Sequence, residues 1–256
     1  MSHPARLTLM GMAIDPITQA EAVGRIVGAI RQGHGGVVVT PNLDHLRLFT
    51  ADPGVRDLYA TADLVLADGM PLVWASRIAG DPLPERVAGS DLIWSLSQAC
   101  AAADLSVFML GGNPGAAEEA GRVLTERFPG LRVAGTLCPP MGFDADPAQM
   151  DAVRAALREA APDVVYVGVS FPRSARVSEA LRADLPAAWF LGLGVSLSFV
   201  SGEVARAPEW VQRTGLEWVF RIIQEPRRLL ARYLVRGLPF AARLGASAAL
   251  QRLRTR

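Results

Sequence analysis

The stretch Val37-Val38-Val39-Thr40-Pro41-Asn42-Leu43-Asp44 decides the fold class of this chain. Consecutive β-branched residues favour a strand that is buried on both faces, and the polar residues that follow mark where this strand ends. The arrangement recurs at Leu64-Val65-Leu66-Ala67-Asp68-Gly69, where an apolar run again gives way to a polar turn. In an open parallel sheet the carboxyl ends of the strands meet at one edge, and ligands bind there. We therefore expect Thr40, Asn42, Asp44 and Asp68 to lie close together.

Apolar strands alternate with helical segments along most of the chain. Strands are predicted at 37–40, 64–67, 107–110, 133–137, 164–169 and 189–193. Helices are predicted at 44–50, 55–61, 71–79, 90–103, 115–128, 148–160 and 174–184. A further helix, which runs to about Arg31, opens with the capping box Thr18-Gln19-Ala20-Glu21. This alternation indicates an α/β fold, a Rossmann-like and mostly parallel sheet with helices on both faces.

The composition changes near Ser201, and a helical C-terminal appendage is predicted beyond it. We expect residues 1–205 to form the α/β domain and residues 206–256 to form the appendage. Residues 211–256 hold ten arginines and two acids, a balance of +8, whereas the whole chain carries a formal charge of +1. Along 217–236 arginines and apolar residues fall on different sides of a helix, and a break is predicted at Gly237-Leu238-Pro239.

A basic amphipathic helix of this kind favours an anionic membrane surface as its partner. The alternative is that its apolar face packs on the domain or on a second copy of the chain, so a homo-oligomer is left open. No recognition motif for nucleic acid stands out, and no nucleic-acid partner is expected. We expect no signal peptide and no transmembrane segment.

Several residue types limit the chemistry that the chain can perform. There is no lysine, so all 26 basic residues are arginines and neither a P-loop lysine nor a Schiff-base lysine is available. Cys100 and Cys138 lack metal-ligand spacing, and we expect both to be small buried apolar residues rather than a disulfide. A reducing cytoplasm fits this expectation. His45 is expected on a helix surface.

Asp144-Ala145-Asp146 has the spacing of the metal-binding pair of many sugar-nucleotide transferases. Pro147 follows it, and an aspartate N-cap with proline at the first helical position explains the pattern fully. We therefore expect neither a metal site nor another cofactor.

A set of ordered motifs resembles the WecG/TagA/CpsF family of bacterial glycosyltransferases, from about Thr40 to about Phe240. The motifs are Thr40-Pro41-Asn42, Ala67-Asp68-Gly69-Met70-Pro71, Glu85-Arg86-Val87-Ala88-Gly89-Ser90-Asp91, Leu110-Gly111-Gly112-Asn113-Pro114-Gly115, Arg206-Ala207-Pro208-Glu209-Trp210, Gly215-Leu216-Glu217-Trp218 and Glu225-Pro226-Arg227-Arg228-Leu229. Members pass an N-acetylmannosamine-type sugar from a UDP-sugar to a lipid-linked acceptor at the inner membrane face. The resemblance implies an inverting hexosyltransferase that acts on a polyprenyl-diphosphate-linked acceptor in cell-envelope or exopolysaccharide biosynthesis. It also implies a cytoplasmic protein that associates peripherally with the inner face of the cell membrane.

The resemblance makes Asp68 the expected catalytic base, which takes the proton of the acceptor hydroxyl. The alternative is that Asp68 only caps the helix that begins near Pro71. Thr40 and Asn42 supply a hydroxyl and an amide for sugar hydroxyls or a nucleobase, and turn chemistry is their alternative. Asp44 is expected either in this polar cluster or as the cap of the following helix.

Phosphate recognition is expected from arginines and from glycine-rich turns. Guanidinium groups bind phosphate oxygens in a bidentate manner, which favours Arg86 over Arg77. Asp91, next to Arg86 in its motif, is also expected among the substrate contacts. Backbone N–H groups at Gly111 and Gly112 open a helix and suit a diphosphate, although a simple tight turn explains them as well. The expected substrate contacts are completed by Gly194 and by three appendage arginines that fold over the pocket, Arg221, Arg227 and Arg228.

Two positions depart from the family pattern. Family members usually carry the motif Gly-x-Pro-x-Gln-Glu, and in this chain Ser174 and Ala175 stand in place of its Gln-Glu pair. Family members also tend to have Phe-Asp where this chain has Leu197-Ser198. Either the donor sugar differs, for example another UDP-hexose or a uronic acid, or the protein is a catalytically inactive membrane-bound assembly factor. A nicotinamide-dependent Rossmann oxidoreductase is a third alternative, against which the missing Gly-x-Gly-x-x-Gly fingerprint counts.

Overall fold

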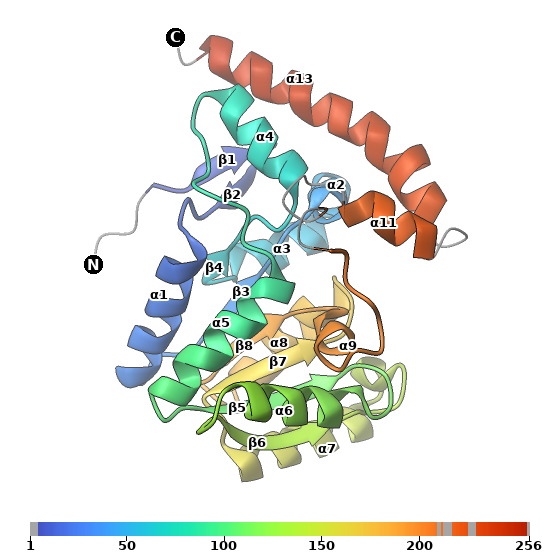
Figure 1. Ribbon diagram of the computed structural model, residues 1–256. Coiled ribbons are helices and arrows are strands. Elements are labelled where there is room, and N and C mark those ends of the chain that lie inside the picture. Colours follow the sequence, from blue (N-terminus) through green and yellow to red (C-terminus); the bar gives the residue numbers. More distant parts are fainter. Residues whose placement is uncertain (1–4, 209–210, 212–216, 225–228, 255–256) are drawn as a thin grey trace.

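The computed structural model describes residues 5–208, 211, 217–224 and 229–254. Within these residues one parallel sheet of six strands is flanked by helices, with the strand order β4-β3-β8-β7-β5-β6 (Figure 1). The strands are β3 (Gly36–Val39), β4 (Leu64–Val65), β5 (Ser106–Gly111), β6 (Arg132–Leu137), β7 (Val164–Gly168) and β8 (Trp189–Gly192). Each predicted strand is present, so the predicted α/β fold is confirmed.

Helices cover both faces of the sheet because alternate strand residues point to opposite sides. In β3, Val37 and Val39 belong to one apolar cluster and Val38 belongs to the other. The first cluster packs under α2 (Leu43–Ala51), α3 (Pro53–Ala60), α4 (Met70–Ala79), α7 (Pro147–Ala160) and α8 (Arg173–Arg182). The second packs under α1 (Gln19–Arg31), α5 (Gly89–Ala102), α6 (Ala116–Arg127) and the short α9 (Ser196–Val200).

Two helix starts that the sequence predicts are confirmed. Thr18 and Glu21 form the capping box of α1, in which each side chain bonds the backbone of the other residue. Asp146 caps α7 by accepting from the backbone N–H groups of Ala148 and Gln149, and Pro147 is the first helical residue. Both caps satisfy N–H groups that have no partner within the helix.

A small antiparallel hairpin, which the sequence reading missed, precedes α1. Its strands are β1 (Leu7–Leu9) and β2 (Met12–Ile14). The buried carboxylate of Asp15, just after β2, accepts from the backbone N–H of Val65 at 2.8 Å and pairs with Arg6 at 3.0 Å. The hairpin is thereby joined to the edge strand β4. Three-residue strands are too short to show the alternation that reveals longer ones.

The C-terminal segment contains α11 (Glu217–Gln224), the π-helical η2 (Ala231–Gly237) and α13 (Leu238–Arg254). The predicted break at Gly237-Leu238-Pro239 is wrong, because η2 passes directly into α13. The missing N–H of Pro239 falls in the first turn of α13, where the hydrogen-bonding pattern already changes. An additional short helix, η1 (Phe143–Ala145), follows β6.

α13 packs on α4, at the end of the molecule away from α6 and α7 (Figure 1). Its buried residues Phe240, Leu244 and Ala248 recur every four positions and join the apolar cluster on the α4 side of the sheet. Gln251 donates from Nε2 to the carbonyl of Thr8 at 3.1 Å. Among the described residues, no helix is long and apolar enough to cross a membrane.

Candidate active site

Three loops meet at the carboxyl edge of β3 and β4 and are joined by backbone hydrogen bonds. Leu66 donates to Val39 at 2.9 Å, Asp68 donates to Pro41 at 2.9 Å, and Val87 donates to Ala67 at 2.8 Å. Gly69 lies so close to Asn42 that a Cβ atom on it would stand 3.3 Å from the Asn42 Cα. The structure therefore brings together the segments that hold Thr40, Asn42, Asp68 and Arg86, as parallel strand ends require.

Asp68 lies one residue before the N-cap of α4, a position that Gly69 occupies. Asp68 is therefore not the N-cap residue of α4, which was the alternative role considered for it. An Asp68 Oδ1 oxygen stands 3.7 Å from Nη1 of Arg86, and the Asp68 side chain is 28% exposed. A carboxylate that is partly desolvated and still reachable is suited to accept a proton.

Arg86 lies between two carboxylates. Besides Asp68 it contacts Asp91, with 3.1 Å between Nη2 and Oδ2, and Asp91 also pairs with Nη1 of Arg206 at 2.6 Å. The sequence predicted phosphate contacts for Arg86 and substrate contacts for Asp91, and here the two side chains bind each other. Sequence reasoning missed Arg206 as a site residue, although it opens a motif that carries the family resemblance.

Thr40 and Asn42 are held by neighbouring backbone. Thr40 is buried, and a Cβ atom on Gly89 at the start of α5 would stand 3.3 Å from its hydroxyl oxygen. Asn42 caps α2, because its Oδ1 accepts from the backbone N–H groups of Asp44 and His45 at 3.0 and 3.2 Å. Because Oδ1 is used in this cap, the other polar group of the Asn42 side chain is its Nδ2 amide group. Asp44 lies in the first turn and pairs with Arg47.

The Gly-rich turn after β5 lies at a reversal of the sheet's connections. The chain leaves β5 towards β6 and leaves β7 towards β8, and such switch points in parallel sheets form ligand crevices. Gly111 and Gly112 have φ angles of +91° and +87°, which favour glycine. Gly112 donates to Gly168 of β7 at 3.0 Å, and α6 begins at Ala116. Gly194, with φ +56°, follows β8 at the same edge.

An aromatic group lines the same edge between β3 and β7. His45 stacks on Phe171, with ring centroids 4.1 Å apart, and its Nδ1 stands 3.4 Å from the hydroxyl oxygen of Tyr59. Burial raises the pKa of Tyr59 well above its usual value, so its hydroxyl stays neutral. His45 lies on α2, as expected of a helix histidine, but it is half-buried and stacks on Phe171 in the loop before α8.

The two positions that depart from the family pattern are buried. Ser174 lies in the first turn of α8, and a Cβ atom on Gly192 at the end of β8 would stand 3.0 Å from its hydroxyl oxygen. Ser198 lies in α9, and its carbonyl accepts from Val204 at 3.1 Å. Both serines are therefore buried in short segments that follow β7 and β8.

Asp144 is held by an arginine. The Nε of Arg173 stands 3.0 Å from both Asp144 carboxylate oxygens, and this hydrogen bonding holds the pKa of Asp144 below its usual range. Within the described part of the chain, no group of three or more histidine, cysteine, aspartate or glutamate residues is placed to hold a metal ion.

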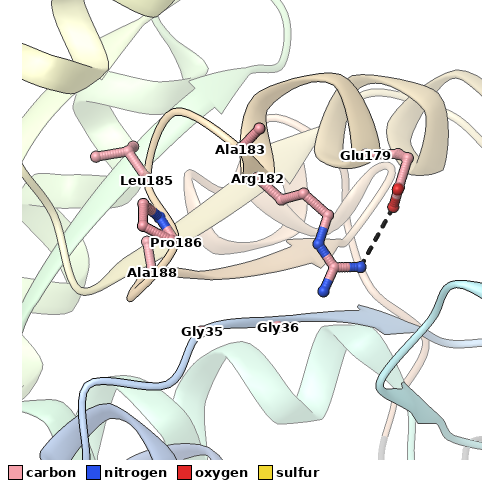
Figure 2. A pocket seen from close by; sticks show the side chains of 8 residues that line it. All are labelled: Gly35, Gly36, Glu179, Arg182, Ala183, Leu185, Pro186 and Ala188. Carbon is pink, nitrogen blue, oxygen red and sulfur yellow. Dashed lines mark hydrogen bonds and ion pairs between the residues drawn. The ribbon is translucent and has the colours of Figure 1, made fainter.

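A cavity of about 430 Å³ lies at the opposite, amino edge of the sheet (Figure 2). Gly35 and Gly36 form one side of it, and Arg182 lies across from them (Figure 2). Arg182 is engaged by Glu179, by Asp63 and by the carbonyl of Thr61. The charged side chains that line this cavity, Arg182 and Glu179, therefore bind each other.

The appendage arginines that the sequence placed over the pocket are not located by the structure. Arg227 and Arg228 lie outside the described residues, and of Arg221 only the backbone, within α11, is described.

Comparison with known proteins gives a consistent result. A family model described as "Glycosyl transferase WecG/TagA/CpsF family" matches residues 7–255. A protein of Bacillus spizizenii is 31% identical over 197 residues, which cover 77% of this chain and 74% of the relative. One from Bacillus subtilis (strain 168) is 28% identical over 199 residues, 78% of this chain and 75% of the relative. Both relatives are named N-acetylglucosaminyldiphosphoundecaprenol N-acetyl-beta-D-mannosaminyltransferase.

Proposed function

Because this chain belongs to the WecG/TagA/CpsF family of glycosyl transferases, we propose that it moves a hexose from a UDP-sugar to a polyprenyl-diphosphate-linked acceptor. The names of the two Bacillus relatives support an N-acetylmannosamine-like donor sugar and an N-acetylglucosaminyl-diphosphoundecaprenol acceptor. The observation that carries the proposal is the position of Asp68, at the carboxyl edge of a parallel sheet and beside Arg86. The product enters cell-envelope or exopolysaccharide biosynthesis.

In the proposed reaction Asp68 is the general base. An acceptor hydroxyl oxygen attacks the anomeric carbon and forms the new glycosidic bond, and its proton passes to the Asp68 carboxylate. The bond from the anomeric carbon to the phosphate oxygen breaks, and its electron pair leaves with UDP. Attack opposite to the leaving group inverts the anomeric configuration. This role is supported by the N-cap of α4, which is Gly69 rather than Asp68.

The leaving diphosphate needs positive charge and hydrogen-bond donors. The N-termini of α5 and α6 open at the carboxyl edge, and Gly111 and Gly112 precede α6 there. Thr40 and the Nδ2 amine of Asn42 are proposed to bind the sugar or the base. We propose that the remaining positive charge comes from Arg221, Arg227 and Arg228 of the C-terminal segment.

The lipid-linked acceptor stays in the membrane, and we assign the docking role to the appendage, residues 206–256. The face of α13 opposite its buried side carries exposed leucines, Leu250 and Leu253, which are 57% and 70% exposed. Exposed arginines, Arg243, Arg252 and Arg254, flank these leucines. Each basic residue near an anionic bilayer contributes about 1 kcal/mol. Peripheral association with the inner face of the cell membrane follows.

The first experiment measures UDP release with polyprenyl-diphosphate-linked N-acetylglucosamine and a panel of UDP-sugars. We expect turnover with one donor, and its loss in Asp68→Asn. Asp184→Asn is a matched control, because Asp184 also pairs with arginines but lies in the loop before β8 at the amino edge. Turnover that survives Asp68→Asn removes Asp68 as the base.

A second candidate function is a catalytically inactive assembly factor. The observation in its favour is that Ser174 and Ser198, both buried, replace the larger polar residues that the family usually carries. The panel separates the two: UDP binding without turnover for any donor or acceptor favours the assembly factor.

A further inference from the structure

We propose that Arg206 is a positioning residue for Asp68, and that it acts through Asp91 and Arg86. This inference rests on the proposed role of Asp68 as the base. It assigns to the first residue of the C-terminal segment a task within the α/β domain, which is to keep the base aligned.

The four side chains form a row of alternating charge. Asp68 and Arg86 are 3.7 Å apart, Arg86 and Asp91 are 3.1 Å apart, and Asp91 and Arg206 are 2.6 Å apart. The two guanidinium groups are the most buried members, with side chains 18% and 19% exposed for Arg86 and Arg206. Each Asp91 oxygen binds a different arginine, so the Asp91 carboxylate bridges the two guanidinium groups.

The contact between Arg86 and Asp68 is the weakest link of the row because it is the longest. Without Arg206, the Oδ1 oxygen of Asp91 loses its cation. A guanidinium group fits both oxygens of a carboxylate, so Arg86 is then drawn fully onto Asp91 and away from Asp68. Burial limits screening by solvent, which makes this competition for Arg86 effective. Arg206 therefore sets how much of Arg86 is available to Asp68.

Arg206 is fixed where the C-terminal segment leaves the domain. α9 ends at Val200, the neighbouring Ala207 is buried, and Val211 is buried and donates to Pro208 at 2.9 Å. Asp91 lies in the first turn of α5, behind the edge that holds Asp68. The position of the C-terminal segment and the alignment of Asp68 are thus coupled through the pair of Arg206 and Asp91.

The test compares Arg206→Met and Arg206→Lys with the control Arg182→Met in the full-length chain. Arg182 pairs with two acids, Asp63 and Glu179, at the amino edge of the sheet. We expect Arg206→Met to lower kcat by about 10²-fold, the effect of misplacing a catalytic group by about 1 Å, with the KM for the UDP-sugar little changed. Arg206→Lys keeps the charge and is expected to retain most of the rate. An Arg206→Met variant that turns over like Arg182→Met overturns the proposal.

A double-mutant cycle identifies the route. If Arg206 acts through Asp91, the variant with both Arg206→Met and Asp91→Asn loses no more rate than the worse single variant. Losses that multiply instead show that Arg206 acts on the substrate directly, and they overturn the proposal. Added guanidinium is expected to restore part of the rate of Arg206→Ala and none of the rate of Asp91→Asn.

A crystal structure of Arg206→Met gives a readout that needs no turnover. We expect the separation between Arg86 and Asp68 to exceed 3.7 Å and Arg86 to bind both oxygens of Asp91. An unchanged arrangement overturns the positioning role even if the enzyme is active. Absence of transfer by the wild-type protein counts against the proposed function alone, because the crystallographic result stands by itself.

Discussion

Two glycines after β5 are the residues for which backbone conformation is most restrictive at the site. We expect Gly112→Ala to lower the free energy of unfolding by about 1–2 kcal/mol, because a residue with a Cβ atom is strained at a φ of +87°. The KM for the UDP-sugar is expected to rise with it. Gly28→Ala is the control, since Gly28 lies inside α1 with open space around its Cα. It is expected to stabilise by about 0.5–1 kcal/mol. Chemical denaturation measures both changes, and an equal effect of the two substitutions contradicts the role of φ.

The two cysteines are expected to differ in reactivity. Burial raises the pKa of Cys100 to about 12, so its thiol is protonated at neutral pH and closed to reagents. Cys138 is only partly buried, and its thiol points to the carbonyl of Gly112 at 3.4 Å. A thiol reagent under native conditions is expected to label Cys138 alone, slowly and faster at higher pH because burial raises the pKa of Cys138 too. Labelling that persists in Cys138→Ser contradicts this assignment.

At the scale of the elements, the pair Asp144–Arg173 joins η1 to the first turn of α8. Hydrogen bonding to Arg173 lowers the pKa of Asp144 in the folded protein, so the folded state binds the proton less readily than the unfolded chain. The pair therefore stabilises the fold above the ordinary aspartate pKa, and this contribution is lost as the pH falls through the lowered pKa. We expect Asp144→Asn to reduce the free energy of unfolding at pH 7 and to match the wild type at strongly acidic pH. A difference that stays constant across that range contradicts the ion pair as its cause.

The same scale shows how far the sequence predicts the fold. Each strand of the parallel sheet is an apolar run bounded by turn residues. The helices show a capping residue or apolar residues at helical spacing. The local sequence is therefore enough to predict these elements. The β1–β2 hairpin was missed because it owes its position to the buried Asp15, whose partner Val65 is 50 residues away. Pro239 predicted a break that the π-helical stretch before it avoids.

The candidate site likewise has a part that the sequence predicts and a part that it does not. The meeting of Thr40, Asn42 and Asp68 follows from the rule that parallel strands end at one edge. The pairing of Arg86 with Asp91 was hidden, because a guanidinium group suits a carboxylate as well as a phosphate and sequence carries no distance. Arg206 belongs to a loop after α9 without periodicity, so only the folded path of that loop brings it to Asp91.

For the whole molecule, the distribution of charge and of exposed apolar residues bears on where the protein works. α13 lies along α4 at one end of the fold (Figure 1). Two leucines of α13, Leu250 and Leu253, are exposed to solvent. For the proposed membrane docking, the arginines beside them attract anionic headgroups, and two leucines add about 3 kcal/mol or more when they leave water.

We accordingly expect the double variant Leu250→Glu and Leu253→Glu to lose at least about tenfold in affinity for vesicles of anionic phospholipid, as measured by co-sedimentation. Met141→Glu is the control, because Met141 is 98% exposed in the loop after β6 and is distant from α13 in sequence. In Figure 1, β6 lies at the end of the fold opposite α13. The double variant is expected to keep its thermal stability and its turnover on a short, water-soluble acceptor, since Leu250 and Leu253 face away from the buried side of α13. Turnover on the polyprenyl-linked acceptor in vesicles is expected to fall with vesicle binding. Equal losses in the Met141→Glu control attribute the effect to added negative charge rather than to this face of α13.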